Sequence, residues 1–310
     1  MSSNAHVPVL LEAVLEGLNL QPEGCYVDAT FGRGGHSREI LRKLGDRGRL
    51  IAVDRDPDAV AAASRGLIDD PRFELVRGDF AQLETFIDER GLGGQVDGLL
   101  FDLGVSSPQL DQAGRGFSFL RDGPLDMRMD TESGTPASAW LATVGEQELK
   151  QVLRQFGEET HAPRIARAIV GARDAAPIER TGQLAEIVAA AKPARGEKIH
   201  PATKTFQAIR IAINDELAQL EKGLHQALRV MRTGARLCVI SFHSLEDRIV
   251  KRFMRNASRE SEQYRGMPDV PPEHRPQLAI VGKPVTASAA EIAANPRARS
   301  ARLRIAERTG

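Results

Sequence analysis

The sequence predicts an α/β protein whose seven-stranded, mostly parallel sheet is interrupted by a mostly helical insertion. Short apolar runs alternate with helix-like segments between residues 24 and 103, which is typical of a parallel sheet covered on both faces. The alternation then stops, and the next strand-like run begins only at residue 236. A chain of 310 residues is long enough for one domain that carries a second.

Each expected strand is a short apolar run that ends near glycine, aspartate or serine. In chain order the runs are residues 25–30, 49–54, 72–77, 96–103, 236–242, 277–283 and 301–307. Too few residues separate the last two runs for a long helix, so we expect an antiparallel pair at the sheet edge. Ligands bind at the carboxyl ends of the strands in open α/β sheets, so we expect the functional site there.

The expected insertion covers residues 110–202, where loops rich in Gly, Pro and Asp precede segments with helical periodicity. A long helix is expected over residues 203–232, because its apolar residues form one stripe. Gly234 is expected to end that helix. These patterns predict a discontinuous sheet domain, residues 1–109 and 203–310, and a helical insert over residues 110–202.

The charges balance over the whole chain but are unevenly distributed along it. The 42 Lys and Arg residues balance the 42 Asp and Glu residues. Residues 1–100 contain 11 basic against 17 acidic residues, whereas residues 150–210 contain 11 against 6. A basic middle fits contact with a polyanion, although a solvated helical face would give the same asymmetry. The candidates for phosphate contacts are Arg164, Arg167, Arg173, Arg195 and Lys198.

Cysteine usage and the first residues indicate the compartment. Only Cys25 and Cys238 occur, so no disulfide framework is expected. The chain starts without a basic segment followed by an apolar stretch, and no apolar run approaches the roughly 18 residues of a membrane helix. We therefore expect a cytoplasmic protein. Spacings typical of metal ligands are missing, so no metal is expected.

A glycine cluster follows the first strand. Gly32, Gly34 and Gly35 allow a tight turn and close approach of a ligand to the backbone. Their spacing is Gly-x-Gly-Gly, which differs from the Gly-x-Gly-x-x-Gly of dinucleotide-binding enzymes. A plain strand-to-helix turn would also use these glycines.

Polar or aromatic side chains follow the next three strands. Asp54 is placed to accept the hydroxyl hydrogens of a ribose, or alternatively to cap the segment that begins at Pro57. After the third strand, Asp79 is placed to hold an adenine amino group and Phe80 to pack on the base, although Phe80 also suits the core. Asp102 can bind the amino-acid part of a cofactor or orient a nucleophile. Together these positions predict a nucleoside cofactor.

Several longer motifs of the chain together resemble those of a known protein family. They are His6-Val-Pro-Val-Leu-Leu-Glu12, Asp28-x-Thr-x-Gly-Arg-Gly-Gly-His-Ser37, Asp54-Arg-Asp-Pro57, Asp102-Leu-Gly-Val-Ser-Ser-Pro-Gln-Leu-Asp111, Arg115-Gly-Phe-Ser-Phe119, Asp126-Met-Arg-Met-Asp130, His200-Pro-Ala-Thr203 and Ser241-Phe-His-Ser-Leu-Glu-Asp-Arg248. This set, which spans residues 6–248, resembles the bacterial RsmH (MraW) family of 16S ribosomal RNA methyltransferases.

The resemblance implies the Rossmann-like S-adenosylmethionine methyltransferase fold. It implies methyl transfer to the exocyclic N4 of a cytosine in the decoding centre of 16S ribosomal RNA, within the small ribosomal subunit, with the insert binding RNA. We expect a monomer or a homodimer. The cofactor contacts that the resemblance implies are Gly34, Gly35, His36, Asp54, Phe80, Asp102 and Gln109. The alternatives are a non-catalytic assembly factor that binds RNA and a methyltransferase acting on DNA or a small molecule.

An exocyclic cytosine amine is a poor nucleophile, because its lone pair is delocalised into the ring. The enzyme must hold the N–H groups with acceptors and align the nitrogen with the methyl group. The candidate catalytic residues are Asp102, Ser106, Ser107 and His243, which follows the fifth strand. Ser244 and the acid three residues later, Asp247, are expected to start a helix.

Aromatic and basic residues of the insert are candidates for substrate binding. Phe117 and Phe119, beside Arg115, either stack on the target base or anchor their loop to the sheet domain. His200 and Lys204 lie at the start of the long helix. They either contact RNA phosphates or anchor the adjoining loop.

Overall fold

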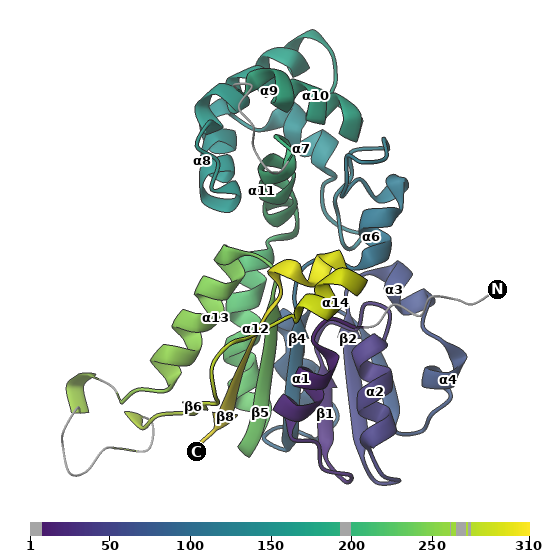
Figure 1. Ribbon diagram of the computed structural model, residues 1–310, viewed down its shortest axis with the longest axis vertical. Coiled ribbons are helices and arrows are strands. Elements are labelled where there is room, and N and C mark those ends of the chain that lie inside the picture. Colours follow the sequence, from purple (N-terminus) through teal and green to yellow (C-terminus); the bar gives the residue numbers. More distant parts are fainter. Residues whose placement is uncertain (1–7, 193–199, 261, 265–270, 272–273) are drawn as a thin grey trace. The chain divides into compact units, whose positions relative to one another are not determined.

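The computed structural model describes residues 8–192, 200–260, 262–264, 271 and 274–310, and the chain forms two compact units (Figure 1). The sheet unit spans Met1–Gly104 and Leu217–Gly310, and the helical unit spans Val105–Glu216. The expected division lay at residues 109 and 202. Both boundaries differ in the structure. Residues 105–109 and the helix that follows residue 202 belong to the helical unit, not to the sheet unit.

The sheet follows the order β3-β2-β1-β4-β5-β8-β6, and β7 pairs with β8. The strands are β1 (Cys25–Asp28), β2 (Arg49–Asp54), β3 (Phe73–Arg77), β4 (Val96–Asp102), β5 (Met231–Ser241), β6 (Leu278–Ile280), β7 (Val285–Thr286) and β8 (Arg302–Arg308). The first five are parallel, and β8 runs antiparallel to β5 and β6. The parallel sheet and its antiparallel edge are thus confirmed, and β7 is an addition of two residues.

Alternate residues of each central strand enter two separate cores. On β4, Leu99 and Phe101 join one cluster and Leu100 joins the other, as the two-residue period of a strand requires. The first core is covered by α5 (Leu83–Asp88), α12 (Glu216–Val230) and α13 (Ser244–Ala257), and the second by α1 (Leu11–Leu18), α2 (Gly35–Lys43) and α4 (Arg65–Ile68). Burial on both faces explains why these strands are nearly continuous apolar runs.

Short helices complete the sheet unit. They are α3 (Pro57–Ala61), η1 (Phe80–Gln82), η3 (Glu262–Tyr264), α14 (Ala289–Ala294) and η5 (Pro296–Ser300). Within the described ranges, no helix has the length and apolarity needed to cross a lipid bilayer.

The helical unit has its own apolar core. It consists of α6 (Ser107–Asp111), η2 (Ala113–Arg115), α7 (Ala137–Thr143), α8 (Glu146–Gly157), α9 (Ala162–Ala175), α10 (Thr181–Ala191) and α11 (Thr203–Asn214). One of the segments expected to be helical forms α10, with Leu184, Val188 and Ala191 buried. The mostly helical character expected for this part of the chain is confirmed.

The single long helix expected over residues 203–232 is wrong. Asp215 has a φ of 50° and separates α11 from α12; Asp tolerates this left-handed conformation better than most residues. The buried amide of Asn214 accepts from the backbone N–H of Met129 at 2.7 Å and donates to the carbonyl of Met127 at 2.7 Å. The far end also differs, because Met231 already pairs with Val96 as part of β5.

Candidate functional site

Three aspartates lie at the same edge of the sheet. Strand β1 ends at Asp28, β2 at Asp54 and β4 at Asp102. Because β1 lies between β2 and β4 and all three strands are parallel, their carboxyl ends are neighbours. The edge expected from the sequence is therefore formed, and it concentrates acceptor groups.

The glycine turn after β1 has a structural reason for each of its glycines. Gly32 and Gly34 have φ values of 55° and 67°, in the left-handed region that favours glycine. A Cβ atom on Gly34 would lie 2.6 Å from the ring of Phe31, and one on Gly35 would lie 2.6 Å from Cγ of Pro8. The turn thus needs glycine for its own geometry, and cofactor contact by Gly34 and Gly35 stays a prediction.

Asp54 fixes this turn and does not cap a helix. Its Oδ2 accepts from the backbone N–H of Gly32 at 2.7 Å, and its Oδ1 accepts from that of Asp56 at 2.9 Å. The cap of α3 is Asp56, which accepts from the backbone N–H of Asp58. Burial raises the pKa of Asp54 to about 6. Each carboxylate oxygen keeps one further acceptor site, which suits the hydroxyl groups of a ribose.

Asp102 carries an acceptor atom without a partner. Its side chain is 25 % exposed, yet Oδ1 is buried and makes no hydrogen bond within the described residues. Its Oδ2 lies 3.5 Å from Nδ1 of His36. Burial raises the pKa of Asp102 to about 6; the charge of His36 opposes that shift, and the charge of Asp28 adds to it. Such a carboxyl group calls for a donor or a cation from a ligand.

Two buried residues hold Asp102 and the turn in place. Nε2 of His36 lies 3.0 Å from the carbonyl of Val9 and carries the proton, because a carbonyl only accepts. Asp28 accepts from the hydroxyl of Ser37 at 2.7 Å, and burial raises its pKa. His36 is 5 % exposed, and its cofactor contact stays a prediction. Sequence reasoning left Asp28 out of the site, although its position as the last residue of the first strand was the available signal.

Phe80 packs with one side on the core. Its ring meets Phe101 edge-on at 5.4 Å, and a Cβ atom on Gly223 would lie 2.8 Å from it. Asp79 accepts from the backbone N–H of Ala81 and pairs with Arg55, both at 2.9 Å. The ring is half-buried, so the core role is present and contact with a base stays a prediction.

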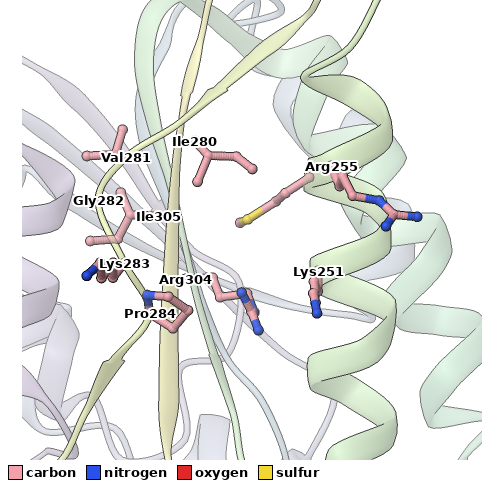
Figure 2. Close-up of a pocket in the computed structure, with 10 residues that line it drawn as sticks. Lys251, Arg255, Ile280, Val281, Gly282, Lys283, Pro284, Arg304 and Ile305 are labelled. Atoms are coloured by element: carbon pink, nitrogen blue, oxygen red, sulfur yellow. The ribbon is translucent and has the colours of Figure 1, made fainter.

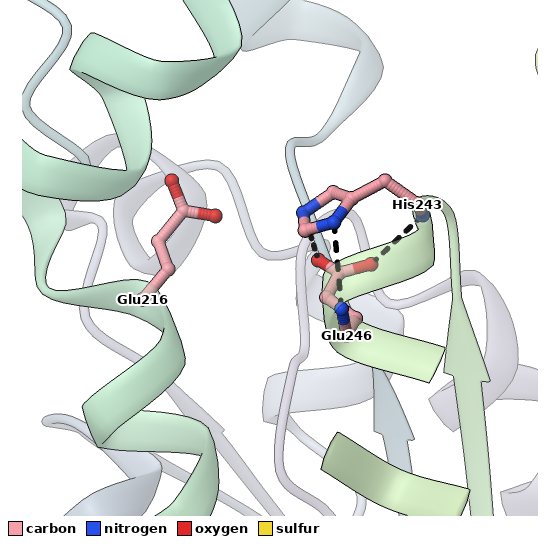
Figure 3. Close-up of side chains that lie close together, drawn as sticks. All are labelled: Glu216, His243 and Glu246. Atoms are coloured by element: carbon pink, nitrogen blue, oxygen red, sulfur yellow. Dashed lines mark hydrogen bonds and ion pairs between the residues drawn. The ribbon is translucent and has the colours of Figure 1, made fainter. Parts of the chain in front are cut away.

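His243, not Ser244, caps α13, which corrects the expected start of that helix. Its Nδ1 accepts from the backbone N–H of Glu246 at 3.4 Å, and its Nε2 lies 3.1 Å from Oε1 of the same residue (Figure 3). Asp247 pairs instead with Arg302 and Arg304. Sequence reasoning missed Glu246, which is 3 % exposed. These contacts are those of a helix cap, and a catalytic role for His243 stays a prediction.

The predicted Ser-Ser-Pro-Gln segment begins the helical unit. Ser106 precedes α6, and its backbone N–H donates to Oε1 of Gln109 at 2.8 Å. Gln109 is 6 % exposed, while Ser106 and Ser107 are half-buried. The segment is therefore a helix start, and its contacts with amine and cofactor stay predictions.

The aromatic residues proposed to stack on a base pack inside the helical unit. Phe117 is 6 % exposed, and the ring of Phe119 lies 4.9 Å from Phe206 and 4.4 Å from His200. Arg115 donates to the carbonyl groups of residues 128 and 129 and is 7 % exposed. The contacts are those expected if these residues anchor their loop. They anchor it in the core of the helical unit, however, and not to the sheet unit.

The predicted phosphate-binding cations that the structure describes divide into two groups. Arg164 and Arg167 are exposed on α9, and neither forms an ion pair within the described part of the chain. Arg173 instead donates to the carbonyls of Leu141 and Val144, both at 2.6 Å, so it ties α9 to the end of α7. Lys204 donates to the carbonyl of residue 158 at 3.2 Å, which is the loop-anchoring contact. Arg195 and Lys198 lie outside the described residues.

The topology and this edge define a class of protein. A parallel sheet with a glycine turn after β1 and acidic acceptors after β1, β2 and β4 is the arrangement of a Rossmann-like enzyme that binds a nucleoside cofactor. The acceptor set fits S-adenosylmethionine. Asp54 offers acceptor sites for ribose hydroxyls, and Oδ1 of Asp102, which has no partner among the described residues, offers a further acceptor at the same edge.

The particular family follows from the sequence. The profile of the MraW methylase family matches residues 3–309, so the chain belongs to that family. The protein is a methyltransferase, and its cofactor is S-adenosylmethionine.

Several solved structures are similar at low identity. A putative rRNA-methylase from Clostridium thermocellum shares 13 % identity at a TM-score of 0.46, over 98 % of this chain and 99 % of that one. An rRNA methylase from Streptococcus thermophilus shares 12 % identity at a TM-score of 0.39, over 97 % and 94 %. A putative methyltransferase from Streptococcus mutans, solved with S-adenosylhomocysteine, shares 10 % identity at a TM-score of 0.41, over 97 % and 99 %. The family assignment rests on the profile match.

The role of Asp54 can be measured directly. Asp54→Ala is expected to weaken binding of S-adenosylhomocysteine roughly 10- to 100-fold, because hydrogen bonds to a charged acceptor are lost and the turn loses its anchor. Titration calorimetry gives the affinity. Asp56→Ala, which removes the cap of α3 and leaves the carboxylate of Asp54 in place, serves as the control and should keep its affinity. Equal losses in the two variants would contradict a direct role for Asp54.

Proposed function

We propose that this methyltransferase methylates the exocyclic N4 of a cytosine in the decoding centre of 16S ribosomal RNA, within the small ribosomal subunit. Membership of the MraW methylase family supports methyl transfer, and the motifs between residues 6 and 248 support this acceptor. The observation that carries the proposal is that Oδ1 of Asp102, at the end of β4, has no partner among the described residues.

Asp102 supplies what a weak amine nucleophile needs. When bound, the cofactor supplies a methyl group on a sulfonium, which is open to attack. A carboxylate that accepts an N–H of the amine directs the nitrogen lone pair out of the ring plane and fixes the line of approach. With a pKa of about 6, Asp102 is mostly ionised at neutral pH and can accept this bond. We propose that Ser106 and Ser107 add acceptors from the segment that follows β4.

The helical unit is proposed to bind the RNA. Arg164 and Arg167 lie one turn apart on α9 and keep their charges free of ion pairs within the described residues. Free guanidinium groups suit phosphates, whose binding releases counterions. We propose that Phe117 and Phe119 support the fold of this unit, because their rings pack in its core.

Methyl transfer from labelled S-adenosylmethionine tests the proposal. The acceptors are small subunits from cells that lack this protein, free 16S ribosomal RNA and duplex DNA, and the labelled nucleoside is identified after digestion. We expect N4-methylcytidine from the ribosomal substrates and no label in DNA. Binding to subunits without transfer would favour an assembly factor and contradict the proposal. Label in DNA, or in another nucleoside, would also contradict it.

A further inference from the structure

A pocket of about 140 Å³ lies in the sheet unit, outside the candidate cofactor site (Figure 2). Its walls come from α13, from β6 and the turn that follows it, and from β8. The side chains that matter are Lys251, Met254 and Arg255 of α13, Ile280 and Lys283 around the turn, and Arg304 of β8.

The rim of the pocket carries positive charge that the described residues neutralise only in part. Four cationic and no acidic residues line it. Arg304 is paired with Asp247 at 2.7 Å. Lys251, Arg255 and Lys283 are exposed, and none forms an ion pair within the described ranges of the chain. Because the chain has no net charge, three free cations around one hollow are a local excess that fits an anionic ligand.

The floor of the pocket is apolar. Met254 is buried, and Ile280 is 55 % exposed, which makes it one of three large hydrophobic residues exposed in the described chain. An exposed apolar side chain beside free cations calls for a ligand that joins an apolar face to a negative charge. Unpaired RNA has this chemistry, since each nucleotide offers a base face and a phosphate. Double-stranded RNA hides its base faces in the stack.

We propose that this cation-rimmed pocket binds an unpaired segment of the RNA substrate, with a base against Ile280 and phosphates on Lys251, Arg255 and Lys283. The inference rests on the proposed function, because RNA is its ligand. Lys251 and Arg255 are one turn apart on α13, so their charges form a short track along the helix, as a nucleic-acid backbone requires. The pocket therefore gives the sheet unit an RNA contact of its own.

Charge reversal tests the rim. The variant combines Lys251→Glu, Arg255→Glu and Lys283→Glu, and the matched control combines Arg42→Glu, Arg47→Glu and Arg65→Glu at exposed positions near α2 and α4. Fluorescence anisotropy with a single-stranded ribonucleotide oligomer gives the affinity at several salt concentrations. We expect at least tenfold weaker binding by the pocket variant and a salt slope smaller by about 2, since three phosphate contacts contribute about 0.7 each. The affinity of the control variant for the oligomer should stay within about twofold of the wild-type value, because phosphate contacts are local.

Ile280→Ser tests the floor separately. It is expected to weaken binding of the oligomer about threefold and to leave binding of an abasic oligomer unchanged, because only the base contact is removed. Cofactor affinity, measured with S-adenosylhomocysteine, should remain that of the wild-type protein in every variant, which also reports correct folding.

Several outcomes would overturn the proposal that this pocket binds RNA. Unchanged RNA affinity in the charge-reversed variant would do so, as would equal losses in the pocket variant and its control. Binding of the wild-type protein to phosphatidylglycerol vesicles, lost in the pocket variant while RNA affinity is kept, would assign the surface to a membrane instead. The readout is RNA binding, so a protein that binds RNA through the pocket but methylates another acceptor would contradict only the proposed function.

Discussion

Asp102→Asn is expected to lower the rate of methyl transfer roughly 10²- to 10³-fold while S-adenosylhomocysteine still binds. The substitution keeps the size of the side chain but removes the negative charge that draws the amine hydrogen. It also places a donor NH₂ group where an acceptor is needed. The rate is measured in single turnovers at saturating cofactor and RNA, so that binding defects do not enter it.

The control for this variant lies on the same strand. Asp97, near the start of β4, accepts from the backbone N–H of Cys25 at 2.7 Å and pairs with Arg232. Asp97→Asn should therefore lower stability and leave the single-turnover rate close to that of the wild type. A rate in Asp102→Asn within about threefold of wild type, well short of the usual effect of an acid–base group, would argue against its proposed role.

The pH dependence provides a second check on Asp102. Burial raises its pKa to about 6, so the carboxyl group becomes protonated as the pH falls through 6 and ceases to accept the amine hydrogen. The wild-type single-turnover rate should fall roughly tenfold per pH unit below that value. Asp54 titrates in the same range, which is why the cofactor must be saturating at every pH. A wild-type rate that stays constant between pH 5 and 7 would contradict the assignment.

Lys192→Met is expected to destabilise the helical unit by roughly 3–5 kcal/mol, because it leaves the carboxylate of Glu159 buried without its counter-charge. The side chains of Lys192 and Glu159 are 3 % and 1 % exposed, and their charged atoms lie 3.1 Å apart. Lys192 also donates to the carbonyl of Pro201 at 3.2 Å, and Glu159 accepts from the backbone N–H of His161 at 3.0 Å. Chemical denaturation followed by circular dichroism measures the change.

A double substitution separates the loss of attraction from the cost of an unpaired charge. Lys192→Met with Glu159→Leu should recover most of the stability, since an apolar pair avoids the desolvation of both ions. The exposed pair Arg252 and Glu221 is the comparison, and Arg252→Met should cost less than about 1 kcal/mol. If Lys192→Met behaves like Arg252→Met, the buried pair does not hold the helical unit together.

Local sequence predicted the sheet because its strands are buried on both faces. The second strand was expected over residues 49–54 and forms β2 with those bounds. Strands of a parallel sheet end at a common edge, so the polar residues that follow them can be grouped from their positions in the sequence. Asp54 and Asp102 lie at this edge, as that reasoning predicted, and the same reasoning would have included Asp28.

The interruption of the long helix lay outside what local sequence can show. The apolar stripe continues across Asp215, so periodicity alone predicts an unbroken helix. The break at Asp215 coincides with hydrogen bonds of Asn214 to residues 127 and 129, which are more than 80 positions away in the chain. Such contacts leave no periodic pattern in the sequence.

The sequence by itself determined the parallel sheet, the sheet edge proposed to bind the cofactor and the methylase family. Only the tertiary structure decided which polar side chains are already engaged within the fold. The proton on Nε2 of His36 is held by Val9, and the guanidinium of Arg115 is held by backbone carbonyls, whereas Oδ1 of Asp102 keeps its capacity for a ligand. The physical reason is that a side chain has few donors and acceptors, and partners distant in sequence determine how many remain for function.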